Sequence, residues 1–339
     1  MKNFETAQII DLVHNSRSIV VTSHYNPDGD AIGSALALTL LLRKLGKDAV
    51  PMVPNEYPDF LKWMPGNELM VVYTENHEKA TQFIHSADVI FCVDYNALHR
   101  TGKMQDDLRS AKGKKILIDH HLQPLKEDFD LILSEIETSS TSELLYKFIS
   151  DCGWERQIDK SVAVSLFIGI MTDTGSFSFS CDWPGTYEIV AQLVKLGIQP
   201  GAIHRLVYDT YSESRLRLLG YCLSEKLTVL PEYKTAYIAL TLEELNRFNY
   251  KVGDTEGVVN YALSIEGVRL AVLLTERKDK IRLSFRSTGD FSVNTLAREH
   301  FAGGGHMNAA GGDSYIPMDE TILKLKKVLA QYIDQLQRS

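Results

Sequence analysis

The sequence lacks features that mark several classes of protein. Its four cysteines are far apart in 339 residues and form no C-x-x-C pair, which argues against a zinc ribbon or a disulfide framework. No apolar run reaches the roughly 20 residues of a membrane-spanning helix. Residues 1–17 mix acidic and basic side chains among the apolar ones, unlike a signal peptide. We therefore expect a cytoplasmic protein without a membrane partner.

The sequence also lacks an excess of positive charge. Its 36 Lys and Arg residues are outnumbered by 44 Asp and Glu residues, which gives a formal net charge of −8 at pH 7. Binding along a nucleic acid backbone depends on clustered Lys and Arg side chains. Long duplex nucleic acid is therefore not an expected partner, and a phosphate-containing substrate needs local recognition.

Two patterns of secondary structure follow one another along the chain. In the first half, short β-branched runs alternate with helical segments, which is typical of a parallel sheet with helices on both faces. From about residue 226, short strand-like runs occur in pairs between shorter helices, which predicts a smaller α+β domain with a mixed sheet. The fold class is therefore α/β with a second domain. We predict a catalytic domain over 1–190, a helical connector over 191–225 and a substrate-binding domain over 226–339.

Capping residues predict where two helices of the first domain begin. Asp30 is well placed as the N-cap of a helix over 31–47. Ser140 and Glu143 match a capping box, in which each side chain bonds the backbone N–H of the other residue. They predict a helix over 139–153 that ends near Gly153.

Charged side chains lie at or just beyond the ends of the strand-like runs 18–24, 89–95 and 114–121, and one more follows an apolar helix. They are His24, Asp28, Asp30, Asp94, Asp119, His120, His121 and Asp173. The carboxyl ends of parallel strands meet at one edge of a sheet, where ligands bind, so we expect these side chains to lie together. Crowded carboxylates resist common ionisation, which calls for cations between them.

Two divalent metal ions are the predicted cations, because their charge balances four carboxylates and leaves a centre that accepts a phosphate. Carboxylate and imidazole ligands without a thiolate favour Mn²⁺, with Mg²⁺ or Co²⁺ as alternatives, over structural zinc. Each motif alone has an ordinary interpretation: PDGD as a capped turn, DHH as a solvated strand end, and TDTGSF as a helix stop with a left-handed Gly175. Their joint occurrence at successive strand ends favours a site.

The motifs resemble those of the DHH phosphoesterase superfamily. The resemblance rests on H-x3-D-x-D-x2-G-S at 24–34, VD at 93–94, DHH at 119–121 and TDTGSF at 172–177. FAGGGHMNAAGG at 301–312, preceded by LSFRS at 283–287, is similar to the associated C-terminal substrate-binding domain. The match covers nearly the whole chain, and its layout is similar to that of the nano-RNase/pAp phosphatase group.

The resemblance implies a role for each of these residues. One metal ion would be held by His24, Asp28 and Asp94, and the other by Asp30, His120 and Asp173, with Asp94 bridging both. His121 would face the scissile phosphate, and Asp119 would orient its neighbours. The implied substrate-binding residues are Arg100, Arg286, Asn294, Gly303, Gly304, Gly305 and His306.

The glycine run 303–305 also has a physical interpretation. Without Cβ atoms, its backbone N–H groups can approach an anion closely, and His306 adds a donor beside them. Arg286 can pair with a terminal phosphate or stack on a base. An ordinary glycine loop and a surface arginine are the alternatives.

The resulting hypothesis is metal-assisted phosphoester hydrolysis. The expected substrates are very short oligoribonucleotides and dinucleotides, cleaved to mononucleotides, and 3′-phosphoadenosine 5′-phosphate (pAp), converted to AMP. One alternative is a phosphodiesterase for cyclic-di-AMP or pApA. Another is a nucleotide-binding sensor without turnover, which should have lost a metal ligand or His121, and neither is lost. A homodimer is left open.

Overall fold

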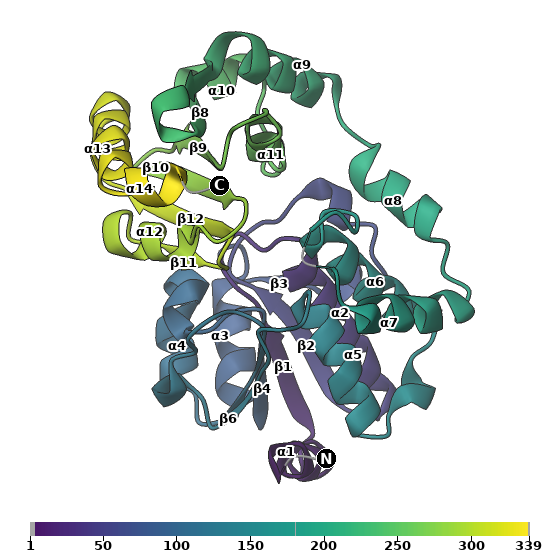
Figure 1. Ribbon diagram of the computed structural model, residues 1–339. Helices are drawn as coiled ribbons and strands as arrows, with labels where there is room; N and C mark the ends of the chain where they lie inside the picture. The colour runs from purple at the N-terminus through teal and green to yellow at the C-terminus, as the bar shows by residue number, and fades with distance from the viewer. Residues whose placement is uncertain (1–3, 180, 338–339) are drawn as a thin grey trace. The chain divides into compact units, whose positions relative to one another are not determined.

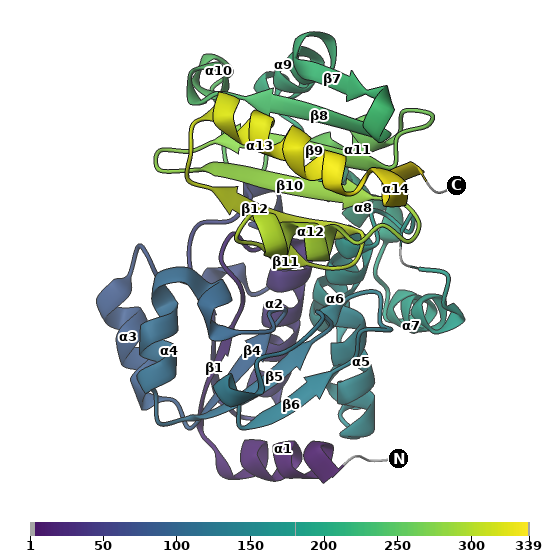
Figure 2. The same cartoon turned by 60° about the vertical axis from the view of Figure 1, so that its left-hand side comes forward.

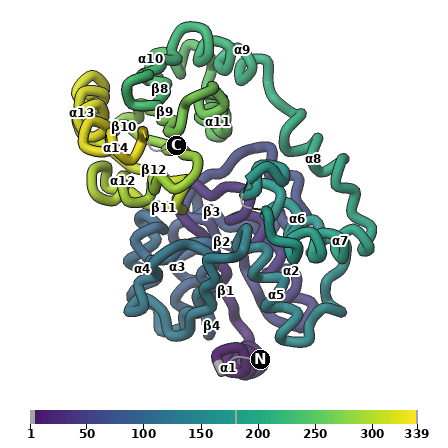
Figure 3. Tube along the Cα trace, in the orientation of Figure 1, coloured from purple at the N-terminus to yellow at the C-terminus, as the bar shows by residue number. Residues whose placement is uncertain are grey.

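The computed structural model describes residues 4–179 and 181–337 and divides the chain into two compact units. Unit 1 is Met1–Thr210 and unit 2 is Tyr211–Ser339. The boundary lies within the connector predicted over 191–225. Figure 3 traces the chain, from purple and teal in unit 1 to green and yellow in unit 2.

Unit 1 contains, within the residues described, a six-stranded sheet whose paired strands are all parallel. The strand order is β3-β2-β1-β4-β5-β6, so the order reverses between β1 and β4. Open parallel sheets bind ligands at such a reversal, beyond the carboxyl ends of the strands. The strands are β1 (Ser18–Thr22), β2 (Asp48–Val53), β3 (Val71–Val72), β4 (Val89–Val93), β5 (Lys114–Asp119) and β6 (Leu131–Ser134).

Helices cover both faces of this sheet (Figures 1 and 2). Ile19 and Val21 of β1 pack with α2 (Gly29–Lys44), α5 (Thr141–Asp151) and α6 (Lys160–Asp173), whereas Val20 packs with α3 (His77–Ser86) and α4 (Gln105–Ser110). This alternation follows from the period-2 geometry of a strand. The other helices of unit 1 are α1 (Phe4–Asn15), α7 (Pro184–Lys195) and α8 (Pro200–Tyr208), with short turns η1 (Asp59–Leu61), η2 (Asn67–Leu69), η3 (Leu98–Met104), η4 (Lys126–Asp128) and η5 (Glu155–Gln157).

Unit 2 contains a mixed sheet in the order β11-β12-β10-β9-β8-β7, in which β8 and β9 are parallel and the other pairs are antiparallel. Its α12, α13 and α14 cover one face, and α9, α10 and α11 cover the other (Figure 2). The predicted fold class is confirmed. The strands are β7 (Leu227–Leu230), β8 (Thr235–Leu240), β9 (Leu270–Glu276), β10 (Ile281–Ser287), β11 (Gly304–Gly305) and β12 (Ala309–Ser314). The helical elements are α9 (Glu213–Tyr221), η6 (Cys222–Lys226), η7 (Pro231–Tyr233), α10 (Leu242–Arg247), α11 (Val258–Leu263), α12 (Val293–His300), α13 (Met318–Gln331) and α14 (Ile333–Gln337).

In the described part of the chain, every helix is too short or too polar to cross a membrane.

The start of α2 differs from the prediction. Its N-cap is Asp28, whose Oδ1 accepts the backbone N–H groups of Asp30 (3.0 Å) and Ala31 (3.1 Å). The prediction of Asp30 as the N-cap is therefore wrong, because the helix begins at Gly29 and Asp30 lies in its first turn. This placement leaves the Asp30 carboxylate available to contact other elements.

The start of α5 agrees with the prediction in part. Ser140 is the N-cap, and its Oγ accepts the Glu143 N–H at 3.0 Å. The Glu143 carboxylate accepts the N–H of Ser139 instead of that of Ser140, so the capping box is not reciprocal. The helix ends at Asp151 with Gly153 in a left-handed conformation (φ 73°), as predicted.

Glycines allow α2 and α6 to pack at close range. A Cβ atom on Gly33 would lie 2.6 Å from the carbonyl oxygen of Ser165, and one on Gly169 would lie 2.5 Å from Oδ1 of Asp30. Real side-chain contacts are not this short, so a methyl group at either position would displace its neighbours. Gly169 therefore leaves the space that the Asp30 carboxylate occupies.

We expect Gly169→Ala to lower the free energy of unfolding of the protein by about 1–3 kcal/mol, because it overpacks the contacts of α6 with Ser142 of α5 and Asp30 of α2. Urea unfolding followed by circular dichroism measures the change. Gly201→Ala is the matched control, since Gly201 lies in α8 with only the tip of Arg205 near its Cβ position, and it should be neutral or stabilising. Equal urea concentrations at the midpoint of unfolding for the two variants would contradict the packing argument.

A second prediction concerns Glu244 in unit 2. Its carboxylate accepts hydrogen bonds from Lys226 (2.7 Å), Tyr221 (2.7 Å) and the Thr241 N–H (2.8 Å). Burial opposes ionisation, but these donors prevail and lower the Glu244 pKa from 4.5 to about 2. Because the pKa is lower in the folded state, this stabilisation is present above about pH 4.5 and is lost as the pH falls toward 2.

We expect Glu244→Gln to lower the free energy of unfolding at pH 7 by roughly 1–3 kcal/mol. The difference from the unsubstituted protein should shrink as the pH falls below 4.5. Urea unfolding at several pH values measures it, and Glu243→Gln, at the neighbouring exposed position, is the control. A difference that does not depend on pH would refute the role of the ionised carboxylate.

Candidate metal centre

The predicted metal ligands lie together at the carboxyl edge of the unit 1 sheet. His24 follows β1, Asp94 follows β4 and His120 follows β5, while Asp30 and Asp173 come from the first turn of α2 and the end of α6. The Nε2 atom of His120 lies 3.2 Å from Oδ2 of Asp173 and 3.9 Å from Oδ2 of Asp30. The strand-order reversal thus brings together residues that are up to 149 positions apart (from 24 to 173) in the sequence.

Among the described residues of unit 1, three sets of candidate ligand atoms contain Asp94, and two of them consist only of predicted metal ligands. In the first, atoms of His24, Asp28 and Asp94 all lie within 4.8 Å of one another, and in the second the same holds for Asp30, Asp94 and His120. Asp94 belongs to both sets. Its Oδ2 lies 3.4 Å from Nε2 of His24, and its Oδ1 lies 3.7 Å from Nε2 of His120. One carboxylate therefore presents a different oxygen to each set.

Burial of so many carboxylates has an electrostatic cost. Asp30 and Asp94 are almost fully buried. Burial raises the pKa of Asp30, and burial together with the charges of Asp30 and Asp28 raises the pKa of Asp94 well above its usual range. Burial alone would lower the pKa of His120, but Asp173, Asp30 and Asp94 raise it to about 9. The cluster therefore favours a positive charge at its centre.

Other groups lower the electrostatic cost of burying charges at the edge of the cluster. Burial lowers the pKa of His24 despite the nearby Asp28, which favours the neutral form of the imidazole that can ligate a cation. Asp28 behaves in the opposite way, because His24 and the backbone N–H groups at the start of α2 outweigh burial and lower the pKa of its carboxyl. These residues, with Asp30, Asp94, His120 and Asp173, form a set of carboxylate oxygens and imidazole nitrogens that suits a hard or borderline divalent cation.

His121 is held by Asp119. Its Nδ1 lies 2.6 Å from Oδ1 of Asp119, which is fully buried. A carboxylate only accepts hydrogen bonds, so the ring proton belongs on Nδ1 and Nε2 is the nitrogen left to face other groups. Burial, followed by the charges of His120 and Arg100, lowers the pKa of His121 well below its usual range.

Arg100 lies near the same cluster. It belongs to η3, and its carbonyl oxygen accepts the N–H of Tyr25 at 2.8 Å, next to His24. The Arg100 charge contributes to the lowered pKa values of both His24 and His121. A half-buried cation at this edge of the cluster is suited to a phosphate oxygen.

The predicted substrate-binding residues of unit 2 lie around the hairpin of β11 and β12. A Cβ atom on Gly303 would lie 2.0 Å from the carbonyl oxygen of Gly311, so the glycine is needed for close strand pairing. The N–H groups of Gly303, Gly305 and His306 donate to Ala297, Asn294 and Ala309 of the same unit.

The N–H groups of Gly303 and Gly305 thus bond residues of α12, and the His306 N–H bonds Ala309 in the hairpin, so these donors are engaged within unit 2. The anion cradle at these glycines stays a prediction. Asn294 is 7% exposed, and its Oδ1 accepts the Gly305 N–H at 3.1 Å, which fixes the loop. The side chains of His306 and Arg286 remain the predicted substrate contacts of unit 2, as does Gly304 in β11.

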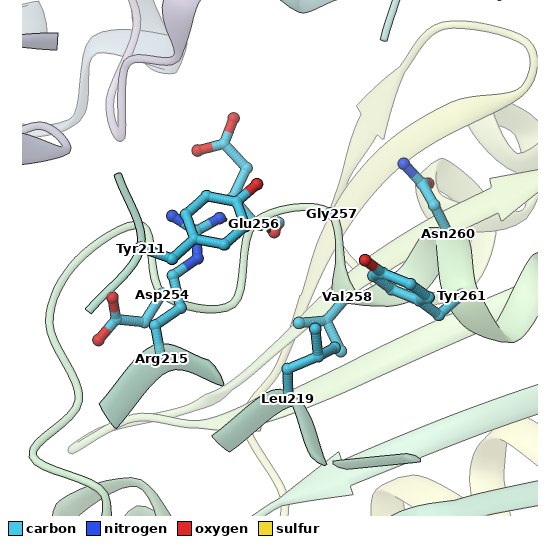
Figure 4. Close-up of a pocket in the computed structure, with 9 residues that line it drawn as sticks. All are labelled: Tyr211, Arg215, Leu219, Asp254, Glu256, Gly257, Val258, Asn260 and Tyr261. Atoms are coloured by element: carbon cyan, nitrogen blue, oxygen red, sulfur yellow. Dashed lines mark hydrogen bonds between the residues drawn. The ribbon is translucent and has the colours of Figure 1, made fainter. Parts of the chain in front are cut away.

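A pocket of about 240 Å³ in unit 2 lies between α9 and the loop before α11 (Figure 4). Its lining residues differ from those predicted to bind substrate. The Arg215 guanidinium stacks 3.8 Å above the Tyr211 ring and donates to the Glu256 carbonyl at 3.2 Å. The arginine thus holds the first residues of unit 2 in place. We assign the chemistry to the cluster in unit 1, where the titratable groups converge.

The prediction missed the start of α5, which contacts two of the carboxylates. The N–H groups of Thr141 and Ser142 donate to the two oxygens of Asp30 at 2.7 and 2.9 Å. The Thr141 hydroxyl donates to Oδ1 of Asp94 at 2.9 Å. The capping residue Ser140 was the only signal in the sequence, and it marked a helix start without indicating what the helix faced.

Two family models match the chain. The model of the DHH family, N-terminal domain, matches residues 18–170, and the DHHA1 domain model matches residues 233–335. The chain belongs to the DHH family. The resemblance predicted from the five motifs is confirmed, and the two matched segments lie in unit 1 and unit 2 respectively.

Similar proteins carry more specific descriptions. The bifunctional oligoribonuclease and PAP phosphatase NrnA of Bacillus subtilis is 28% identical, over 88% of this chain and 90% of its own. The cyclic-di-AMP phosphodiesterase GdpP of the same organism is 24% identical over 96% of this chain, which spans about half (49%) of that protein. An exopolyphosphatase-related protein from Bacteroides fragilis has a solved structure with a TM-score of 0.92, 42% identity and 98% coverage of both chains.

Proposed function

We propose that this DHH-family protein is a two-metal phosphoesterase that hydrolyses very short oligoribonucleotides and dinucleotides to mononucleotides and pAp to AMP. The observation that carries the proposal is the pair of ligand sets that share Asp94. The similarity to oligoribonuclease and PAP phosphatase proteins along most of the chain supports the choice of substrates.

The donor set fits two divalent cations, with Mn²⁺ as the first choice. His24, Asp28 and Asp94 would hold one ion, and Asp30, His120 and Asp173 would hold the other, with Asp94 shared. Bound ions of this kind neutralise phosphate charge and make water a stronger nucleophile. Burial and the charges of Asp30 and Asp28 raise the pKa of Asp94, so a nearby cation would stabilise its ionised carboxylate.

The remaining residues of the site would handle the substrate. Hydrolysis adds water across a P–O bond, so the phosphate remains on one product and a hydroxyl group forms on the other. Asp119 keeps the His121 proton on Nδ1, which directs Nε2 toward the scissile phosphate. Arg100 would pair with a phosphate oxygen, and Arg286 and His306 would bind the nucleotide.

The second candidate function is cleavage of cyclic-di-AMP or pApA, which the similarity to cyclic-di-AMP phosphodiesterases favours. Because this chain spans about half of those proteins, their activity is a weaker guide than that of relatives of equal length. A sensor without turnover is disfavoured, since every predicted metal ligand is present and lies in the cluster.

The deciding experiment incubates the full chain and Mn²⁺ with a five-nucleotide RNA, pApA, cyclic-di-AMP, pAp and pyrophosphate, and separates the products by chromatography. Release of mononucleotides from the short RNA and pApA, and of AMP from pAp, is the expected result. Preferential opening of cyclic-di-AMP would support the second candidate. Tight nucleotide binding with no turnover of any substrate would overturn the proposal.

Asp28→Asn tests the metal assignment without disturbing the helix start, because Asn caps helices as well as Asp does. We expect turnover of pApA under Mn²⁺ to fall by at least about 100-fold, a loss beyond the 10–100-fold typical of groups one step removed from a metal. The midpoint temperature of thermal unfolding should change little. Asp106→Asn, an exposed charge change on α4, is the control. Full activity in Asp28→Asn would exclude Asp28 as a ligand.

A further inference from the structure

The segment 138–142, between β6 and α5, contacts several of the proposed ligands. The carbonyl oxygen of Thr138 lies 3.3 Å from Nδ1 of His120. The N–H groups of Thr141 and Ser142 hold both oxygens of Asp30, and the Thr141 hydroxyl holds one oxygen of Asp94. These contacts reach the second ligand set and the carboxylate that both sets share.

The segment is well placed to impose its geometry on the ligands. Residues 140–143 are fully buried. Oε2 of Glu143 accepts the Ser139 N–H (3.1 Å), the Ser139 hydroxyl (2.6 Å) and the Thr186 hydroxyl of α7 (2.7 Å). Lys147 pairs with the other oxygen of Glu143 at 2.8 Å. The start of α5 is therefore anchored by contacts with residues outside the cluster.

Asp94 needs such support because of its backbone. Its φ is +64°, in the left-handed region that residues other than glycine seldom adopt. The carboxylate lies where repulsion from Asp30 and Asp28 favours turning it away. The Thr141 hydroxyl meets Oδ1, the oxygen that faces His120, and Oδ2 is left toward His24.

We propose that Thr141 is a positioning residue that fixes the rotation of the Asp94 carboxylate so that one oxygen faces each metal ion. This inference rests on the proposed two-metal site. The backbone N–H of Thr141 donates separately to Asp30, so the Thr141 side chain can be changed without removing that contact. Loss of the hydroxyl leaves Oδ1 without this donor, and the carboxylate can rotate away from the position that both ions require.

Thr141→Val removes the hydroxyl and keeps the branched shape. We expect the weaker of two Mn²⁺ ions to bind about 10–100-fold less tightly, as for other groups that orient metal ligands, and the electron paramagnetic resonance signal of a coupled Mn²⁺ pair to diminish. Thr141→Ser should restore both. Thr321→Val is the matched control, because Thr321 is as buried as Thr141 and its hydroxyl donates to the Ile316 carbonyl of unit 2. Isothermal titration calorimetry measures the two affinities.

The outcomes separate this inference from the function on which it rests. If the unsubstituted protein binds fewer than two Mn²⁺ ions, the two-metal proposal fails. If it binds two and Thr141→Val binds both with unchanged affinity, the role of Thr141 is overturned, and the same follows if Thr141→Ser does not recover binding. Should Thr141→Val fail to fold, Thr141→Ala against Thr141→Ser gives the same comparison, since these two side chains differ only in the hydroxyl.

Discussion

Repulsion among buried carboxylates is the constraint on which the rest of unit 1 depends. Asp30, Asp94 and Asp119 are almost fully buried, with Asp28 and Asp173 at their side. Bringing unpaired carboxylates out of water is strongly unfavourable, so the fold must supply compensating donors. It does so with the N–H groups at the start of α5, with the hydroxyl of Thr141, and with the imidazoles that follow β1 and β5. The cations that we propose would neutralise the negative charge that these donors leave uncompensated.

The packing of the helices serves the same end. A carboxylate in the first turn of α2 can be buried only if the facing helix leaves room, and Gly169 on α6 does this. Because the same contact brings Ser142 of α5 beside Asp30, three helices meet where one charge is buried. The close α2–α6 contact therefore both contributes to the core and creates a polar site at the edge of the sheet.

Sequence reasoning predicted the parts of this structure that depend on periodicity. The strand-like runs and the charges that follow them indicated a parallel sheet with a ligand-binding edge, since the carboxyl ends of parallel strands must meet there. The fold class and the family were predicted correctly. The N-cap of α2 was assigned to Asp30 instead of Asp28 because both residues are good caps and only the first helical turn distinguishes them.

Contacts between distant segments could not be predicted in this way. Thr141 meets Asp94 across 47 positions, and nothing in the local sequence marks that hydroxyl as different from those of Ser139 and Ser142. The glycines of β11 show the opposite problem. Their residue type suggested an anion site, but the close approach of β12, which requires a glycine at 305, becomes visible only when the hairpin is formed. Local sequence signals identified the residues, and tertiary pairing decided what each one does.

The charge of the cluster also bears on the order of events in the proposed reaction. Without cations, the site presents several carboxylates to a phosphate. The positive groups that oppose them are the Arg100 guanidinium and a protonated His120. The chain as a whole adds no attraction, since its net charge is −8. A phosphate would therefore be repelled until the carboxylates are neutralised. In the proposed reaction, the cations would therefore bind before the substrate, and the dense hydrogen bonding around Asp30 and Asp94 would hold the ligands in place for them.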